Sequence, residues 1–349
     1  MFFRMVNPRA RRWQGVTAAL AAALILAGCS SGTSPAPLPR PSGTLRLGYT
    51  ADLADAPALA GMQMGFLGTD LGAVTLDPEL FSSPMTEAQA LVRGQLDAAY
   101  LDPVTAVAVW QAEAKRGGLI KVIAGTASGG AELVAGGGVT NPRQLVHASV
   151  VAPPGGAQLT ALEWWLRQHG VSDTTPPDAT MTSGYVARAL RSGKLAAAWE
   201  PAPEDAELVA AGAHVLLNEA SLWPGGRFPT AVLVVTSSFL KQHPAVVSLL
   251  LRGEIQAEQY LDTDRVMADK AAGARLAAVQ PPAVPSAILA RAFSQVTFTN
   301  DPMSALLLAE AQHAAAVGLL SPVPNLNGLI DLGPLNTQLR ASGFAQISS

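Results

Sequence analysis

The chain has 349 residues, of which 49% are hydrophobic and 14% charged, and its formal net charge is −3. This slightly acidic balance excludes the strongly basic surface that general nucleic-acid binding requires. With one cysteine in the whole chain, an internal disulfide is excluded as well.

The first residues have the pattern of a secretory leader. Four arginines and no acid precede an almost wholly apolar run at residues 15–27. That run is shorter than the roughly 20 residues of a spanning helix, so we expect it to be removed rather than retained. It ends in LAGC at residues 26–29, which resembles a lipobox. The sequence therefore predicts a signal peptide at 1–28 and a lipid anchor on Cys29.

Residues 29–43 are rich in Ser, Pro and Gly, which is typical of a flexible tether. Without the leader the chain has 19 basic and 26 acidic residues, a net charge of −7. We expect it on the outer side of the cell membrane, held by its lipid. The folded part begins near Thr44 and, at roughly 300 residues, exceeds what one core usually organises, so two lobes are predicted.

Strands and helices alternate through the first part of the body. The hydrophobic pattern predicts strands at 44–49, 73–76, 97–101 and 120–125, with helices at 56–64, 86–93 and 103–114 between them. Such alternation indicates a largely parallel sheet with helices on both faces.

The alternation begins again further along the chain. Strands are predicted at 149–152, 179–181, 196–199 and 215–217, with helices at 158–169 and 185–190. Residues 230–236 form a continuous apolar run, as a fully buried strand does. The remainder reads as helices at 244–261, 264–278, 286–293 and 302–317. The predicted fold class is α/β with a helical C-terminal part.

Several segments occur in the order of a known family, among them LRLGYTADLADAPALAG, GQLDAAYLDPVTAV, GKLAAAWEPAPE and SLWPGGRFPTAVLVVTSSFLKQHP. Together they resemble the solute-binding proteins of ABC importers for sulfonates, taurine and nitrate, a branch shared with thiamine-precursor (NMT1/THI5-like) binders. The resemblance implies a type II periplasmic-binding-protein fold, with lobe I at 44–127 and 230–349, lobe II at 128–229 and two crossing segments. It also implies a monomer without cofactor that captures a small solute and delivers it to an ABC permease and its ATPase.

Four turns follow predicted strands, where an α/β lobe binds its ligand near free helix N–H groups. A helix start favours an anion by about 0.3 to 1 kcal/mol when exposed. The alternative is that these turns only cap helices. The candidate ligand contacts in them are Ser82, Ser83, Asp102, Ser128, Gly129, Gly130, Gly156 and Gln158.

Aromatic residues at strand ends are candidates for shaping the cleft. Tyr49, Tyr100 and Trp199 are predicted contacts, and Trp223 is a further candidate. The alternative for each is that its ring fills a gap in the core.

Three acidic residues differ from the usual sequence of the family that the chain resembles. Asp102 stands where that family often has glycine. Glu200 and Glu204 fall in a motif that often reads W-x-P-E-P-W. An uncompensated carboxylate disfavours a bare anion, whereas an ammonium would be favoured. The predicted solute is therefore a small sulfonate or, better, a taurine-like amino-sulfonate. Nitrate, a thiamine-pyrimidine precursor and a sensory role without transport stay open, as does a capping role for the acids.

Catalytic motifs are missing from the sequence. The five histidines are far apart, none forms an HExxH pair, and no metal site is predicted. The glycines around Ser128 are not spaced as in a nucleophile elbow, and Cys29 is accounted for by lipid. We expect a binding protein and not an enzyme.

Overall fold

The computed structural model describes residues 43–69, 71–113, 118–171, 181–321 and 325–348. The predicted signal peptide, Cys29 and nearly all of the tether lie outside these residues, as does most of the strand predicted at 179–181. None of the helices in the described part is long and apolar enough to cross a membrane.

The larger sheet has six strands in the order β10-β4-β9-β3-β1-β2. Only β1 pairs in parallel, with β2 and β3, whereas β9 is antiparallel to β3 and β4, and β10 is antiparallel to β4. The expectation of a largely parallel sheet is therefore wrong here, because β9 returns from the second sheet instead of following a helical crossover. The strands are β1 (Gly43–Thr50), β2 (Val74–Phe81), β3 (Ala98–Leu101), β4 (Ile120–Gly129), β9 (Pro229–Thr236) and β10 (Val296–Phe298).

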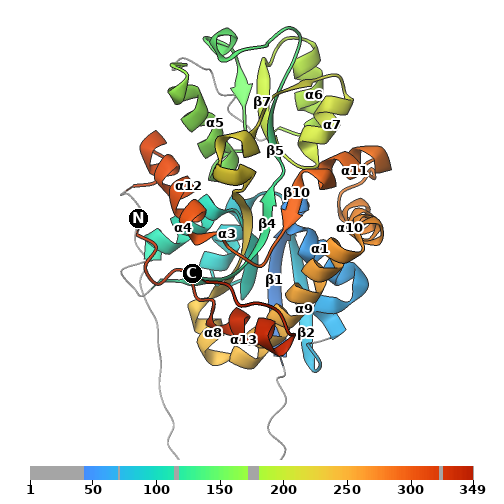
Figure 1. The fold of residues 1–349 in the computed structure, drawn as a ribbon, viewed down its shortest axis with the longest axis vertical. Coiled ribbons are helices and arrows are strands. Elements are labelled where there is room, and N and C mark those ends of the chain that lie inside the picture. Colours follow the sequence, from blue (N-terminus) through green and yellow to red (C-terminus); the bar gives the residue numbers. More distant parts are fainter. Residues whose placement is uncertain (1–42, 70, 114–117, 172–180, 322–324, 349) are drawn as a thin grey trace, which may run out of the picture. The chain divides into compact units, whose positions relative to one another are not determined.

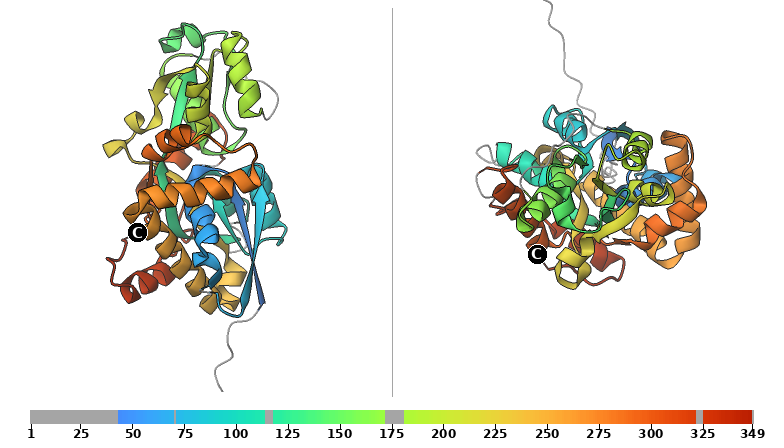
Figure 2. Two further views of the ribbon diagram at one scale, coloured as in Figure 1. Left: turned by 90° about the vertical axis from the view of Figure 1, so that its right-hand side faces the viewer. Right: turned by 90° about the horizontal axis from the view of Figure 1, so that it is seen from above.

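Both faces of this sheet are covered by helices, because alternate side chains point to opposite faces. Leu47 and Tyr49 belong to a core with α1 (Ala56–Met64), α9 (Pro244–Thr263) and α10 (Arg265–Val279). Leu101 and Val232 belong to a second core with α3 (Pro84–Val92), α4 (Pro103–Glu113) and α12 (Ser304–Val317). Figure 2 shows α10, in orange, lying across α1.

The smaller sheet has four strands in the order β6-β7-β5-β8, of which only β6 and β7 are parallel. Leu133 and Trp199 pack with α5 (Gly156–Gln168), while Val134 and Ala198 pack with α6 (Ser183–Arg191) and α7 (Glu204–Ala210). In Figure 1, α5 lies on one side of β5 and β7, and α6 and α7 lie on the other. The strands are β5 (Ala131–Ala135), β6 (Val150–Val151), β7 (Ala197–Pro201) and β8 (His214–Asn218).

Several short elements were not predicted from the sequence, because they are too short to show a period or lack a turn that marks their start. The strands β5 and β10 were not predicted, and neither was α7. The other helices are α2 (Phe66–Thr69), α8 (Ser237–Gln242), α11 (Ser286–Ser294) and α13 (Gly333–Ala341), with short 3-10 helices η1 (Leu53–Asp55), η3 (Pro142–Leu145), η4 (Glu219–Leu222) and η5 (Pro224–Gly226).

Two segments connect the sheets, and they are hydrogen-bonded to each other. Strand β4 leads into β5 with only Gly130 between them, as Figure 1 shows. The Gly129 N–H donates to the Phe228 carbonyl over 3.2 Å, and the Thr230 hydroxyl donates to the Gly129 carbonyl over 2.6 Å. The Phe228 N–H donates to the Ser128 hydroxyl over 3.3 Å. We call these two connections the crossing segments.

Ser128, Gly129 and Gly130 were predicted to form a turn after a strand that ends at residue 125, and this is wrong, since β4 extends to Gly129 and continues almost directly into β5. Gly129 has φ +85°, and a Cβ atom at this position would lie 2.6 Å from the Gln295 carbonyl oxygen. Only glycine fits both the positive φ and the close approach of β10. These glycines shape the crossing rather than a helix N-terminus.

Candidate functional site

The carboxyl ends of β1 and β3 carry the acids on which the candidate site is built. After β1, the Asp52 side chain caps η1 by accepting a hydrogen bond from the Ala54 N–H over 2.8 Å. After β3, Asp102 is 6% exposed, and its Oδ1 accepts from the Thr105 N–H at the start of α4 over 3.0 Å. Parallel strands end at one edge of a sheet, which is why these two carboxylates come together.

Asp102 reaches from the larger sheet to the start of α5. A Cβ atom on Gly156 would lie 2.8 Å from Asp102 Oδ2, so the carboxylate lies directly against this turn. Gly156 has φ +70°, which favours glycine there. Burial raises the pKa of Asp102, and hydrogen bonds from Thr105 and from backbone N–H groups that include Ala157 in the first turn of α5 oppose the rise. The anion-binding end of α5 thus already faces a carboxylate supplied by the chain itself.

A hollow of about 500 Å³ opens beside this contact. It lies between α3, α4 and the first turn of α5, and its lining is mainly apolar. Val104 and Thr105, which follow Asp102, contribute to its wall, as do Gly155 and Gly156. The lining also includes the polar side chains of Gln89 and Arg93, and Asp102 itself is not part of it.

Glu219 at the start of η4 receives two indole N–H groups. The Trp199 Nε1 donates to Glu219 Oε2 over 2.9 Å, and the Trp223 Nε1 donates to Oε1 over 3.3 Å. Burial raises the pKa of Glu219 to about 7, and these hydrogen bonds oppose the rise. The hydrogen bonds from Trp199 and Trp223 thus fix the orientation of the Glu219 carboxylate.

Helix α12 contributes a further acid, Glu310, which is 4% exposed. Neither of its carboxylate oxygens has a hydrogen-bond partner in the part of the chain that the structure describes. Burial raises its pKa well above the usual value, and the charges of Glu219 and Asp102 raise it further. Burial thus favours the neutral, protonated form of Glu310.

A second set of acids follows β7. Burial raises the pKa of Glu200 to about 8, with added repulsion from Asp205 and Asp52. It raises the pKa of Asp205 to about 7, and the charge of Glu132 raises it further. The pKa of Glu204 is raised by burial and by Asp52. Asp52 itself has a pKa of about 6, raised by burial and by Asp102.

Arg291 of α11 pairs with Glu132 of β5 over 2.6 Å, and the Glu132 side chain is 5% exposed. The Leu53 N–H donates to the Ala202 carbonyl over 3.1 Å, which joins η1 to the end of β7. These contacts hold elements of the two sheets together around the acids.

The structure brings part of the predicted ligand set together. Asp102 and Gly156 are in contact, Gln158 is buried in the first turns of α5, and Glu200 belongs to the second set of acids. Ser83 caps α3, with its hydroxyl accepting from the Thr86 N–H over 3.3 Å. Ser82, one residue earlier, is exposed.

The aromatic residues that were predicted to contact the solute are buried in the protein core. Tyr49 and Tyr100 are each 1% exposed, and Trp199 is fully buried. The Tyr49 hydroxyl accepts from Arg275 over 2.9 Å, and the Tyr100 hydroxyl donates to Glu254 over 2.6 Å. The Tyr49 hydroxyl can still donate and the Tyr100 hydroxyl can still accept, but neither residue lines the hollow beside Asp102.

Asp52, Asp205 and Glu310 were not predicted as site residues. The signal for Glu310 was a lone acid in the otherwise apolar segment SALLLAEAQHAAAV. For Asp52 it was the position directly after the first strand, where the Asx cap begins η1. Within the described residues, no group of three or more His, Cys, Asp or Glu side chains has an arrangement that could hold a metal ion.

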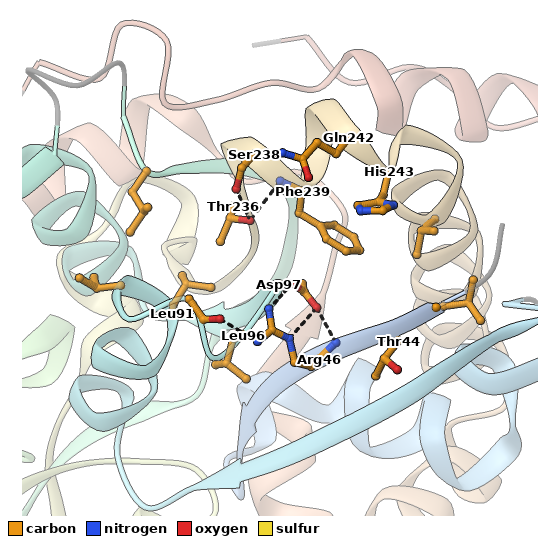
Figure 3. Close-up of a pocket in the computed structure, with 16 residues that line it drawn as sticks. Thr44, Arg46, Leu91, Leu96, Asp97, Thr236, Ser238, Phe239, Gln242 and His243 are labelled. Atoms are coloured by element: carbon orange, nitrogen blue, oxygen red, sulfur yellow. Dashed lines mark hydrogen bonds and ion pairs between the residues drawn. The ribbon is translucent and has the colours of Figure 1, made fainter. Parts of the chain in front are cut away.

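A separate polar hollow of about 460 Å³ lies at the amino ends of β1 and β3 (Figure 3). Arg46 crosses it and donates to both carboxylate oxygens of Asp97, at 3.0 and 2.6 Å. Its remaining guanidinium nitrogen donates to the Gly94 carbonyl over 2.7 Å. All three guanidinium nitrogens of Arg46 thus form hydrogen bonds that link β1 to the segment just before β3.

Solved structures share this architecture. The alkanesulfonate-binding protein SsuA from Xanthomonas axonopodis pv. citri, bound to MOPS, is 17% identical, with 84% of this chain and 99% of that chain covered and a TM-score of 0.69. The periplasmic nitrate-binding protein NrtA from Synechocystis PCC 6803 is 14% identical, with 86% and 89% covered and a TM-score of 0.71. The periplasmic aliphatic sulphonate binding protein SsuA from Escherichia coli is 15% identical, with 84% and 92% covered and a TM-score of 0.66.

These likenesses define the class of the fold: it is a type II periplasmic-binding-protein fold, as predicted. No curated protein sequence matches the chain. The model of the NMT1-like family matches residues 39–278. The chain therefore belongs to the NMT1-like family, and the family resemblance seen in its sequence is confirmed.

Proposed function

We propose that the chain is an extracytoplasmic solute-binding protein that captures a small amine-bearing solute and delivers it to an ABC permease. Its family and fold support a binding role, since the structural relatives named above are described as binding alkanesulfonates, MOPS and nitrate. The sequence-derived candidate is a taurine-like amino-sulfonate. On this proposal the chain acts as a monomer, and Cys29 carries the lipid that keeps it beside the permease.

The contact between Asp102 and the first turn of α5 carries the choice of solute. A free helix start would stabilise a sulfonate or nitrate, but here the chain places its own carboxylate at 2.8 Å from the Cβ position of Gly156. A bare anion would meet this negative charge. An ammonium group would instead form a charge-assisted hydrogen bond with the Asp102 carboxylate.

The hollow beside this contact suits the apolar part of such a solute. Its volume of about 500 Å³ exceeds that of a short alkyl chain, and its lining is mainly apolar. Burial of methylene groups there would add about 0.8 kcal/mol each. Apolar burial there would add to the charge recognition proposed for Asp102, which lies next to the hollow through Val104 and Thr105.

Capture is proposed to occur by closure about the two crossing segments. In the proposed arrangement, residues 44–127 and 230–349 form one lobe and residues 128–229 the other. The solute shifts the equilibrium only if it binds the closed state more tightly than the open state. The contacts of Asp102 with Gly156 and of Arg291 with Glu132 are those that closure would form.

Thermal unfolding with matched solutes tests the proposal. Taurine and ethanesulfonate differ only in the ammonium group, so taurine should raise the unfolding temperature of the full-length protein in detergent and ethanesulfonate should not. Nitrate and an aminopyrimidine complete the panel. Asp102→Gly should weaken the response to taurine and strengthen the response to nitrate. A wild-type protein that responds to nitrate or ethanesulfonate but to no amine would contradict the amine assignment.

A further inference from the structure

The hollow between α3, α4 and the first turn of α5 has a cationic residue in its otherwise mainly apolar lining. That residue is Arg93, the C-cap of α3, and Gln89 lies one turn before it on the same helix. Among the described residues that line the hollow, Arg93 alone carries a charge. The hollow is therefore not a uniform apolar space, because a positive group marks one part of its wall.

Arg93 has no anionic partner in the described part of the chain. The ion pairs found there involve Arg46, Arg265 and Arg291, and the Arg93 guanidinium forms no hydrogen bond there either. A guanidinium presents its N–H donors in a planar fork that matches a carboxylate or a sulfonate. Arg93 is exposed at the rim of the hollow. Its charge is thus available to an anionic group of a bound molecule.

Arg93 and the turn that begins α5 lie at opposite ends of the hollow. At one end, the Met85 methyl carbon lies 2.9 Å from the Cβ position of Gly155, and Asp102 Oδ2 lies 2.8 Å from that of Gly156. Met85 belongs to the first turn of α3, whereas Arg93 ends this helix. At about 1.5 Å per residue, the two ends are about 12 Å apart along α3. A carboxylate beside one end and a guanidinium at the other thus flank a mainly apolar space.

We propose that the solute is an extended ω-amino acid or ω-amino-sulfonate, with its ammonium at Asp102, its alkyl chain in the hollow and its anionic group at Arg93. This rests on the proposed function and narrows its solute class. An extended chain advances about 1.1 to 1.2 Å per bond, so about eight bonds between the charged groups cover most of the distance. The arginine side chain spans the rest. Taurine, with two carbons between nitrogen and sulfur, is too short to contact both residues.

Opposite charges at the two ends also exclude other molecules of the same length. A diamine would place one ammonium beside Arg93, and a dianion would place one anionic group beside Asp102. Each of these contacts is a repulsion between like charges, which disfavours the wrong solute. The hollow therefore selects an extended zwitterion and fixes its direction.

Isothermal titration of the full-length protein in detergent tests the solute class. The series is 8-aminooctanoate, 8-aminooctanamide, which lacks the anionic group, octanoate, which lacks the ammonium, and β-alanine, which is short. The first should bind about ten-fold or more tightly than each of the others. Equal binding of 8-aminooctanamide would overturn the role of Arg93, and equal binding of β-alanine would overturn the extended length. Both results would leave the proposed amine binding intact.

Two other outcomes would overturn the proposed function together with this inference. Octanoate that binds as tightly as 8-aminooctanoate would show that the ammonium contributes nothing. Absence of binding by every amine in the series, and by the aminopyrimidine, would show that the chain does not recognise amines.

Variants assign the anionic end. Arg93→Gln should weaken binding of 8-aminooctanoate about ten-fold and leave binding of 8-aminooctanamide unchanged. Arg252→Gln is the matched control, because Arg252 of α9 is also exposed and without an ion pair in the described part of the chain, but lies outside the lining. Unchanged affinity in Arg93→Gln, or an equal loss in both variants, would overturn the assignment.

A third variant tests the position of the alkyl chain. Ala108 of α4 is exposed and lines the hollow, so Ala108→Leu adds volume there without disturbing the core. This variant should weaken binding of 8-aminooctanoate about ten-fold and leave binding of β-alanine unchanged. Unchanged affinity for 8-aminooctanoate would overturn the placement of its chain between α3 and α4.

Discussion

The imidazole ring of His313 lies stacked on the indole ring of Trp164, with centroids 4.2 Å apart and an angle of 9° between the planes. His313 also faces Trp223, at 5.3 Å and 34°. His313 belongs to α12, Trp164 to α5 and Trp223 lies beside η4, so one imidazole joins three elements. Helix α12, which covers the larger sheet, is thereby attached to elements of the smaller one.

Replacement of His313 by alanine should loosen this attachment. Loss of the stacked pair is expected to lower the free energy of unfolding by about 1 kcal/mol. His313→Phe is the control, since it keeps an aromatic ring between the two indoles. Urea unfolding of both variants measures the difference. Similar destabilisation by alanine and phenylalanine would show that the stacking is not what stabilises this contact.

Stacking at His313 should also depend on pH. Burial lowers the pKa of His313, so the unfolded chain binds a proton more readily than the folded protein does. The contribution of this residue to stability is therefore present above the unfolded pKa, near 6.5, and is lost as the pH falls below it. Between pH 7.5 and pH 5.5 the unfolding free energy of wild type should therefore fall relative to that of His313→Phe.

Gly156→Ala should disturb the turn that faces Asp102. Alanine at this position would have to adopt φ +70°, and its methyl group would lie 2.8 Å from Asp102 Oδ2. We expect a loss of about 1 to 3 kcal/mol in unfolding free energy, together with weaker solute binding. Gly193→Ala is the control, because Gly193 has φ +72° and no atom within 4 Å of its Cβ position. A control variant that loses as much solute affinity as Gly156→Ala would contradict the role of the contact with Asp102.

Trp199→Phe should leave Glu219 with one indole donor. The lost hydrogen bond is the shorter of the two, at 2.9 Å, and Trp199 is fully buried. We expect a decrease of about 1 to 3 kcal/mol in unfolding free energy, measured with urea near pH 7. Trp223→Phe removes the longer bond, at 3.3 Å, and should cost less. The reverse order would contradict the assignment of Trp199 as the main partner of Glu219.

Glu254→Gln should reduce the pH dependence of stability. Burial raises the pKa of Glu254 to about 8, so between the unfolded value near 4.5 and pH 8 the folded protein holds a proton that the unfolded chain releases. Stability is therefore lost as the pH rises through this window. The variant should exceed wild type in unfolding free energy by more than about 1 kcal/mol at pH 8 and differ little at pH 5. The Tyr100 hydroxyl can still donate to the glutamine carbonyl oxygen, which preserves the native contact.

Long periodic segments were predictable from the sequence because their pattern follows from local geometry. The helix predicted at 56–64 is α1 (Ala56–Met64), and the strand predicted at 44–49 lies within β1 (Gly43–Thr50). Pro57 near the helix start and Gly65 in the left-handed conformation after it define the limits of α1. The strand β5 was missed because its five residues directly follow β4 without a turn that would mark a boundary.

The family, the α/β class and the unusual acids Asp102 and Glu200 could be predicted from the sequence alone, since they follow from residue order and local pattern. The tertiary structure was needed to show that β9 enters the larger sheet antiparallel, and that Ser128, Gly129 and Gly130 lie in a crossing segment and not in a turn. Burial, together with the charges of Glu219 and Asp102, raises the pKa of Glu310, although Glu310 follows Asp102 by more than 200 residues in the chain. Contacts between residues so distant in the chain depend on how helices pack on sheets, and no local pattern of apolar residues carries that information.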